Sequence, residues 1–181
     1  MTSKQFKSYF NQILYENPLP FGYRWQLQHL QNSSLNDPGW SELLYRTFAE
    51  YKCKRGHRWK SAWAMVIFRF RLDSRNGFGR VRMRRFGVRC RECGDKDDSY
   101  HVGICGETQT WYLVQCLLRQ IVPRCYGERF YDDDDDVQNV VIIETDVPRG
   151  GNGGGSHPKN LCEACANNCC QERFKRLTKK K

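Results

Sequence analysis

The spacing of cysteine residues constrains this chain more than any other feature. Two cysteine pairs, Cys90/Cys93 and Cys162/Cys165, are each separated by two residues. This spacing lets both sulfur atoms of a tight turn reach one zinc ion, which accepts thiolate and imidazole ligands in tetrahedral sites. We therefore predict that the chain folds around bound zinc.

Further candidate ligands accompany these pairs. Cys53 and His57 lie four positions apart in a glycine-containing turn, and His157 and Cys170 flank the last cysteine pair. Cys169 competes with Cys170, and spacing alone does not choose between them. Eight ligands would close two tetrahedral zinc sites, and closed sites are structural rather than catalytic. The predicted ligands are Cys53, His57, Cys90, Cys93, His157, Cys162, Cys165 and Cys170.

Disulfide bonds are the alternative use of these cysteines. The first ten residues, MTSKQFKSYF, contain no apolar run typical of a secretory signal peptide. The longest apolar run, Ala62 to Phe68, is too short for a membrane helix. We therefore expect a cytoplasmic chain without a transmembrane segment. Thiols stay reduced in that compartment, which favours metal over a disulfide framework.

The formal charge of +10 is unevenly distributed. Nine arginines and no lysine lie between Arg69 and Arg91. Guanidinium groups suit phosphate and carboxylate partners. Three interpretations stay open: RNA or another nucleic acid, an acidic membrane surface or acidic protein, or a solvated face neutralised by the acidic run at residues 132–136. The arginines predicted to share one strand face are Arg69, Arg71, Arg80, Arg82 and Arg84.

Hydrophobic periodicity predicts three helices. The first covers residues 2–17 and stops before two prolines, and residues 21–36 are expected to be irregular. The second begins at Asp37-Pro38, with an apolar stripe from Trp40 to Tyr51. The third runs from Glu107 to about Arg119, and Pro123 should end or kink it.

Alternating side chains predict strands over residues 62–72 and around 81–84, joined by a turn at 73–77 in which Asn-Gly favours positive φ. A further strand is expected over 137–144. The predicted fold class is α+β: a small antiparallel β-sheet with flanking helices, stabilised by two structural zinc sites. We expect an N-terminal segment (1–36), a zinc-binding domain (37–172) with a flexible glycine-rich loop (150–156), and a basic tail (173–181).

The order of these motifs resembles a known family. The segment from Tyr51 to Ser61, with Cys53 and Trp59, is similar to the opening motif of the three-CxxC-type zinc-binding domain. The segment 79–93, which ends in Cys-Arg-Glu-Cys, resembles its second motif. Cys125-Tyr126-Gly127 and the His157 to Cys170 segment resemble its end. The likeness covers about Trp40 to Cys170, and its branch is the receptor-transporting proteins.

This resemblance implies a zinc-binding accessory or chaperone-like protein that promotes trafficking of G-protein-coupled receptors, of the odorant or taste type, to the cell surface. It implies no enzyme activity and no small-molecule substrate, and it allows a peripheral position at the endoplasmic reticulum or plasma membrane. The alternative is an interferon-induced, RNA-binding antiviral effector, which the arginine face would suit. Two departures stand out: the first pair is Cys53-x-x-x-His57 instead of C-x-x-C, and the C-terminal membrane helix typical of the family is missing from this sequence.

Overall fold

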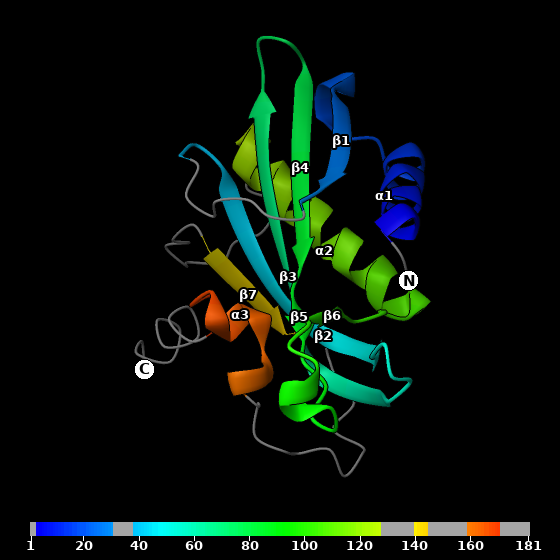
Figure 1. Cartoon of the computed structure of the whole chain (residues 1–181). Coiled ribbons are helices and arrows are strands. Elements are labelled where there is room, and N and C mark those ends of the chain that lie inside the picture. The colour runs from blue at the N-terminus through cyan, green and yellow to red at the C-terminus, as the bar shows by residue number, and fades with distance from the viewer. Residues whose placement is uncertain (1–2, 31–37, 128–139, 145–158, 171–181) are drawn as a thin grey trace. The chain divides into compact units, whose positions relative to one another are not determined.

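The computed structural model of the chain describes residues 3–30, 38–127, 140–144 and 159–170 (Figure 1). Its helices and strands follow one another in a mixed order along the chain. They are α1 (Ser3–Glu16), β1 (Arg24–His29), β2 (Ser41–Lys52), β3 (Arg58–Asp73), β4 (Phe78–Arg85), β5 (Gly87–Val88), β6 (His101–Val102), α2 (Glu107–Tyr126), β7 (Val140–Glu144) and α3 (Glu163–Ala166), with short 3₁₀ turns η1 (Pro20–Gly22), η2 (Gly94–Lys96) and η3 (Lys159–Leu161).

The strands form a five-stranded sheet in the order β1-β4-β3-β2-β7 and a two-stranded sheet of β5 and β6. Neighbouring strands joined by four or five residues must run antiparallel, which applies to β3 with β4 and to β2 with β3. β1 pairs with β4 in parallel, from Arg24 opposite Phe78 to His29 opposite Met83. The α+β class is confirmed, but the larger sheet is mixed and not purely antiparallel.

The described chain separates into two compact units, and the first comprises residues 1–44, 67–84 and 107–141. Helix α1 buries Phe6, Phe10 and Ile13 and packs beside α2 and β1. Helix α2 lies behind β3 and β4 in Figure 1. Its buried stripe recurs at helical spacing, which explains why this segment is a helix: Leu113, Val114, Leu117, Leu118 and Ile121.

The second unit comprises residues 45–66, 85–106 and 142–181. It contains β5 and β6, which pair antiparallel with Val88 opposite His101. Helix α3 lies against β5. Most of the cysteines are in this unit, so a large part of its interior is made of sulfur and aromatic side chains.

The helix predicted from Asp37 is wrong, because residues 41–52 form β2. Leu43, Leu44 and Tyr45 are consecutive and fully buried, so this part of the strand is covered on both faces. A continuous run of buried residues is compatible with both a helix and a strand. Pairing with β3 makes this segment a strand. The irregular segment expected over 21–36 is also wrong where β1 forms.

Other predicted elements are confirmed. Helix α1 and the β3–β4 hairpin lie where expected, and Gly77 has a φ of +59°, as the Asn-Gly turn predicts. Helix α2 continues through Pro123 to Tyr126, beyond its predicted end. None of the helices in the described ranges is both long and apolar enough to cross a membrane. The acidic run at 132–136, the glycine-rich loop at 150–156 and the basic tail lie outside the described residues.

Candidate metal centre

Four predicted ligands from two distant segments meet in the second unit. The donor atoms of Cys53, His57, Cys90 and Cys93 all lie within 4.8 Å of one another. The Nδ1 atom of His57 is 3.4 Å from the sulfur of Cys53, 3.6 Å from that of Cys90 and 3.3 Å from that of Cys93. The sulfurs of Cys53 and Cys93 are 3.8 Å apart. Sequence reasoning named all four residues but could not pair them.

These separations match the edges of a zinc tetrahedron. With zinc–sulfur bonds of about 2.3 Å and zinc–nitrogen bonds of about 2.0 Å, tetrahedral geometry places two sulfurs about 3.8 Å apart and sulfur about 3.5 Å from nitrogen. Soft thiolate sulfur and imidazole nitrogen are also the donors that zinc prefers. The four-residue group therefore fits a closed zinc site with one histidine and three cysteines.

Backbone hydrogen bonds shape both halves of this group. In the turn between β2 and β3, the amide of Cys53 donates to the carbonyl of His57 at 3.0 Å, and the amide of Gly56 donates to the carbonyl of Cys53 at 3.0 Å. Gly56 has a φ of +92°, a conformation that residues with side chains rarely adopt. After β5, the amide of Lys96 donates to the carbonyl of Cys93 at 3.1 Å. Each half is thus a folded turn that presents two donors.

The surroundings of this group shift the pKa values of two of its thiols in opposite directions. Burial raises the pKa of Cys93 to about 12, together with hydrogen bonds to Cys90 and Cys53. Burial also opposes ionisation of Cys53, but hydrogen bonds from the backbone of Arg55 and His57 and from the thiols of Cys93 and Cys90 together outweigh it and lower the pKa of Cys53 to about 7. Zinc binds thiolates, so binding must release protons from these sulfurs.

Aromatic and acidic neighbours complete the first group. Trp59 packs against the three buried cysteines and stacks on Tyr51, with ring centroids 5.3 Å apart and an interplanar angle of 9°. The Nε2 atom of His57 faces away from the sulfurs and lies 3.5 Å from a carboxylate oxygen of Glu92. Such a carboxylate orients a metal-binding imidazole. Sequence reasoning missed Glu92, although it stands between the two cysteines of the Cys-Arg-Glu-Cys motif.

The second group contains three of the remaining predicted ligands. The sulfurs of Cys162, Cys165 and Cys170 lie within 4.8 Å of one another. Hydrogen bonding to Cys162, followed by burial, raises the pKa of the Cys170 thiol, and burial raises that of Cys165. The sulfur of Cys169 instead donates to the carbonyl of Asn167 at 3.3 Å. His157 lies outside the described residues.

Strand β5 and helix α3 position the second group. Val88 forms an isolated bridge with Cys162, and the amide of Arg89 donates to the carbonyl of Leu161 at 2.8 Å. The carboxylate of Glu163 accepts a hydrogen bond from the amide of Gly87 at 2.6 Å. After α3 the chain turns back, and the amides of residues 169 and 170 both donate to the carbonyl of residue 164. This turn brings Cys170 back to the first two sulfurs.

The predicted arginine face is smaller in the structure. Arg69 is buried, and its Nε donates to the carboxylate of Glu42 at 2.8 Å, while Arg84 is also buried. These two arginines are paired or enclosed because the sheet is covered on both faces at these positions. Arg71 and Arg80 are exposed and Arg82 is half-buried, so three arginines of the expected five remain at the surface.

Comparison with known proteins agrees with this chemistry. A family model described as a zinc-binding domain, of the three-CxxC zinc-ribbon type, matches residues 46–168. Receptor-transporting protein 3 of Mus musculus is 26% identical over 179 residues, which cover 94% of this chain and 34% of that protein. Receptor-transporting protein 4 of Homo sapiens is 27% identical over 138 residues, covering 76% of this chain and 52% of that protein. Receptor-transporting protein 1 of Homo sapiens is 33% identical over 98 residues, covering 51% of this chain and 35% of that protein. No solved structure matches the chain.

Two clusters of zinc-type donors define a zinc-binding domain, and the family match covers more than half of the chain. The chain belongs to the three-CxxC-type zinc-binding domain family, and its curated relatives place it in the receptor-transporting branch. It spans about a third to a half of the length of these relatives. The resemblance seen in the sequence is confirmed, as is zinc as the cofactor that the two groups fit.

Proposed function

We propose that this chain is a zinc-stabilised accessory protein that helps G-protein-coupled receptors, of the odorant or taste type, to reach the cell surface. One observation carries the proposal: a four-donor metal group lies within a domain whose relatives are named receptor-transporting proteins. Four protein donors fill the coordination of tetrahedral zinc and leave no position for a substrate. The proposed role is therefore structural and non-catalytic.

In this proposal Cys53, His57, Cys90 and Cys93 hold one ion, and the group of Cys162, Cys165 and Cys170 holds the other. His157 is the candidate for the fourth ligand of the second ion. Binding of a structural zinc contributes directly to folding free energy. The first ion would tie the β2–β3 turn to the segment that follows β5, and so would fix the loops of the second unit that a receptor could contact.

Co-expression with an epitope-tagged chemosensory receptor tests this function. Surface receptor is measured by antibody staining of intact cells, and total receptor is measured after permeabilisation. We expect the chain to raise the surface fraction and Cys90→Ser to abolish the increase. Cys116→Ala is the matched control, because Cys116 is a buried cysteine of α2 outside both groups. An unchanged surface fraction across a panel of receptors would reject the proposal.

RNA binding is the second candidate function, and the surface arginines favour it. The guanidinium carbons of Arg71 and Arg82 lie 4.8 and 4.2 Å from the centre of the Trp40 ring, and that of Arg80 lies 5.5 Å from the Phe78 ring. Single-stranded nucleic acid is bound by such combinations of cationic groups and aromatic faces. We call these three arginines with Trp40 and Phe78 the arginine–aromatic strip.

Fluorescence anisotropy with a labelled single-stranded RNA tests this second function. We expect binding that weakens steeply with salt and is lost when Arg71, Arg80 and Arg82 are changed to Glu. Lys7→Glu reverses an exposed charge of α1 that is not part of the strip, and it should change affinity little. Binding of the protein to acidic phospholipid vesicles is measured in parallel. Binding of the vesicles without the RNA, or salt-insensitive RNA binding, would reject the RNA function.

A further inference from the structure

The backbone at Phe21 is unusual for its residue type. Its φ is +63° and its ψ is 8°, the left-handed region that a bulky side chain rarely adopts. The residue is nevertheless 73% exposed to solvent. Glycine would occupy this conformation without strain, and the next residue, Gly22, does so at a φ of +62°. Retaining an exposed aromatic ring on a strained backbone points to a use for the ring outside folding.

The Phe21 ring belongs to a cluster of three aromatic rings at the surface of the first unit. Its centroid lies 5.7 Å from that of Tyr23 and 5.8 Å from that of Tyr126, and the two tyrosine rings are 6.0 Å apart. The interplanar angles lie between 25° and 35°, so Phe21 stacks on Tyr126 and the other two ring pairs are tilted. The indole nitrogen of Trp25 donates to the hydroxyl of Tyr126 at 2.9 Å, which fixes that ring.

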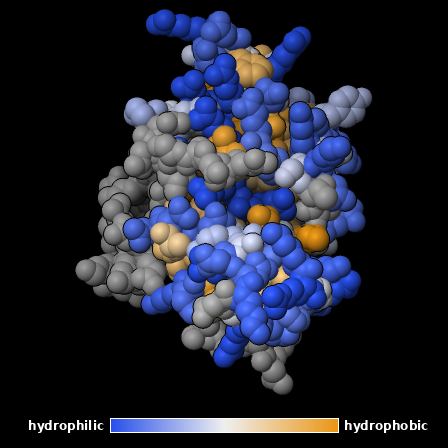
Figure 2. Space-filling model, in the orientation of Figure 1, coloured by the Kyte–Doolittle hydropathy of each residue, from blue (hydrophilic) through white to orange (hydrophobic). Residues whose placement is uncertain are grey.

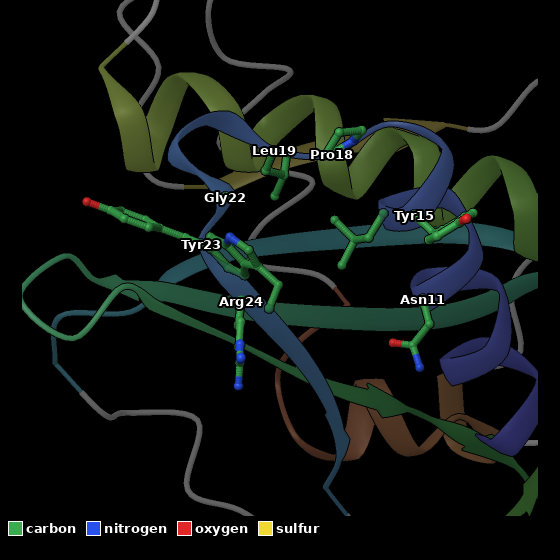
Figure 3. A pocket seen from close by; sticks show the side chains of 9 residues that line it. Asn11, Tyr15, Pro18, Leu19, Gly22, Tyr23 and Arg24 are labelled. Carbon is green, nitrogen blue, oxygen red and sulfur yellow. The ribbon is translucent and has the colours of Figure 1, made fainter.

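A groove of about 390 Å³ adjoins this cluster. Figure 3 shows the residues that line it. Tyr15 and Asn11 belong to α1, Pro18 and Leu19 belong to the connection that follows, and Tyr23 immediately precedes β1. The volume is within the range of small-ligand sites, which is about 300–1,000 Å³. Its walls are mainly apolar and aromatic. The face of the molecule seen in Figure 2 is largely hydrophilic.

The polar groups of the groove can all donate hydrogen bonds. Besides the indole of Trp25, which donates to Tyr126, they are the amide of Asn11, the hydroxyls of Tyr15 and Tyr23, and the guanidinium of Arg24, which extends from β1 at the edge of the groove in Figure 3. Apart from Trp25, none of these side chains makes a hydrogen bond or ion pair with another residue in the described part of the chain. The groove lining contains no acidic residue, so its charge is that of Arg24 alone.

We propose that this groove binds a proline-rich extended segment of a partner protein that carries an acidic residue at one end. Polyproline II segments present carbonyl oxygens that no internal hydrogen bond occupies, and proline lacks an amide donor. A groove that offers tyrosine hydroxyls and an asparagine amide beside flat rings is complementary to such a segment. Arg24 at the edge supplies the complement for the acidic residue.

Other occupants fit the groove less well. A nucleic-acid strand needs a cationic path along its backbone, and the groove provides one arginine. An extended strand would need a run of exposed backbone partners, whereas Pro18 and Pro20 interrupt the amides of the connecting segment. The proposal is independent of the metal groups and of the receptor-transport function, because every residue that carries it lies in the first unit.

The test measures fluorescence anisotropy of a labelled ten-residue peptide of prolines and leucines with two glutamates at one end. A matched peptide replaces each proline by alanine and keeps length and charge. We expect saturable binding of the first peptide and at least about tenfold weaker binding of the second. A labelled single-stranded RNA and phosphatidylserine vesicles are measured in parallel. Equal binding of the two peptides, no peptide binding, or binding of RNA or vesicles to the groove in place of the peptide overturns the proposal.

Substitutions at the groove test whether the peptide binds there. Phe21→Gly removes the ring but suits the backbone conformation, so the thermal midpoint should not fall while peptide affinity drops by about tenfold. Arg24→Gln should weaken the glutamate-bearing peptide and leave a peptide without glutamates unaffected. Arg119→Gln removes an exposed arginine of α2 as the control, and it should bind like the wild-type protein. Peptide binding that is unchanged by both Phe21→Gly and Arg24→Gln contradicts the proposed site.

Discussion

The Nδ1 atom of His57 lies 3.3 Å from the sulfur of Cys93, although 36 positions separate the two residues in the sequence. This contact joins the β2–β3 turn to the turn that follows β5. Each turn is folded by its own backbone hydrogen bonds, and two of the four donors come from each. A metal ion between them would act as a cross-link between the two turns.

The first prediction concerns metal content. Elemental mass spectrometry of the purified protein should find two zinc ions per chain, and His57→Ala should reduce this to one. His57→Cys should restore two, because cysteine supplies a thiolate ligand from the same position of the turn. The control is His101→Ala, which changes a histidine outside both groups. Two ions in His57→Ala would exclude His57 as a ligand.

The second group makes a separate prediction that distinguishes adjacent cysteines. Cys170→Ser should lose one zinc ion, whereas Cys169→Ala should keep both, because the sulfur of Cys169 donates to a carbonyl and lies outside the donor cluster. Loss of zinc is expected to lower the thermal midpoint of Cys170→Ser, since metal binding contributes to folding. The reverse pattern, with zinc lost in Cys169→Ala alone, would assign the ligand to the neighbouring residue.

The sequence identified the metal chemistry more reliably than it identified the strands around it. Cysteine pairs separated by two residues have few uses in a reduced compartment, so Cys90/Cys93 and Cys162/Cys165 pointed to zinc directly. Residues 41–52 were expected to be helical because a run buried on both faces has no distinguishing period. Pairing with β3 determines its structure, and such long-range pairing leaves no local signal.

The arginines illustrate the same limit. Alternation along the hairpin predicts that Arg69 and Arg71 share one face, yet only Arg71 is exposed. Arg69 is buried because Glu42, 27 positions earlier, supplies a carboxylate at 2.8 Å. Because the two residues are far apart in the sequence, the sequence pattern does not show that they pair. An exposed cationic face and an internal ion pair therefore give the same alternating pattern of arginines.

The third prediction contrasts this internal ion pair with an exposed one. Glu42→Ala leaves the Arg69 guanidinium enclosed without its carboxylate, which should lower the free energy of unfolding by about 3–5 kcal/mol. Glu50→Ala breaks the pair with Lys60, in which both side chains are largely exposed, and should cost less than about 1 kcal/mol. Urea unfolding followed by circular dichroism measures both. Equal effects of the two substitutions would contradict the burial-based ranking.

The fourth prediction concerns the pH dependence of the β3–β4 turn. The side chain of Asn76 donates to one carboxylate oxygen of Asp73 at 2.7 Å, and its amide donates to the other at 3.3 Å. These hydrogen bonds, led by the side-chain contact, hold the pKa of Asp73 below its ordinary value of about 3.9. A depressed pKa in the folded state means that this carboxylate stabilises the turn above the unfolded pKa. The contribution is lost as the pH falls through the folded pKa.

Carbon-13 NMR of the Asp73 carboxyl group between pH 6 and pH 2 measures this value directly. In Asn76→Ala the side-chain donor is removed, so the pKa of Asp73 should rise toward the ordinary value while the backbone donor keeps part of the shift. Asn11→Ala, on the exposed face of α1, is the control and should leave the titration unchanged. A pKa of Asp73 that does not respond to Asn76→Ala would show that the turn amides and nearby Arg80, and not the Asn76 side chain, hold the carboxylate ionised.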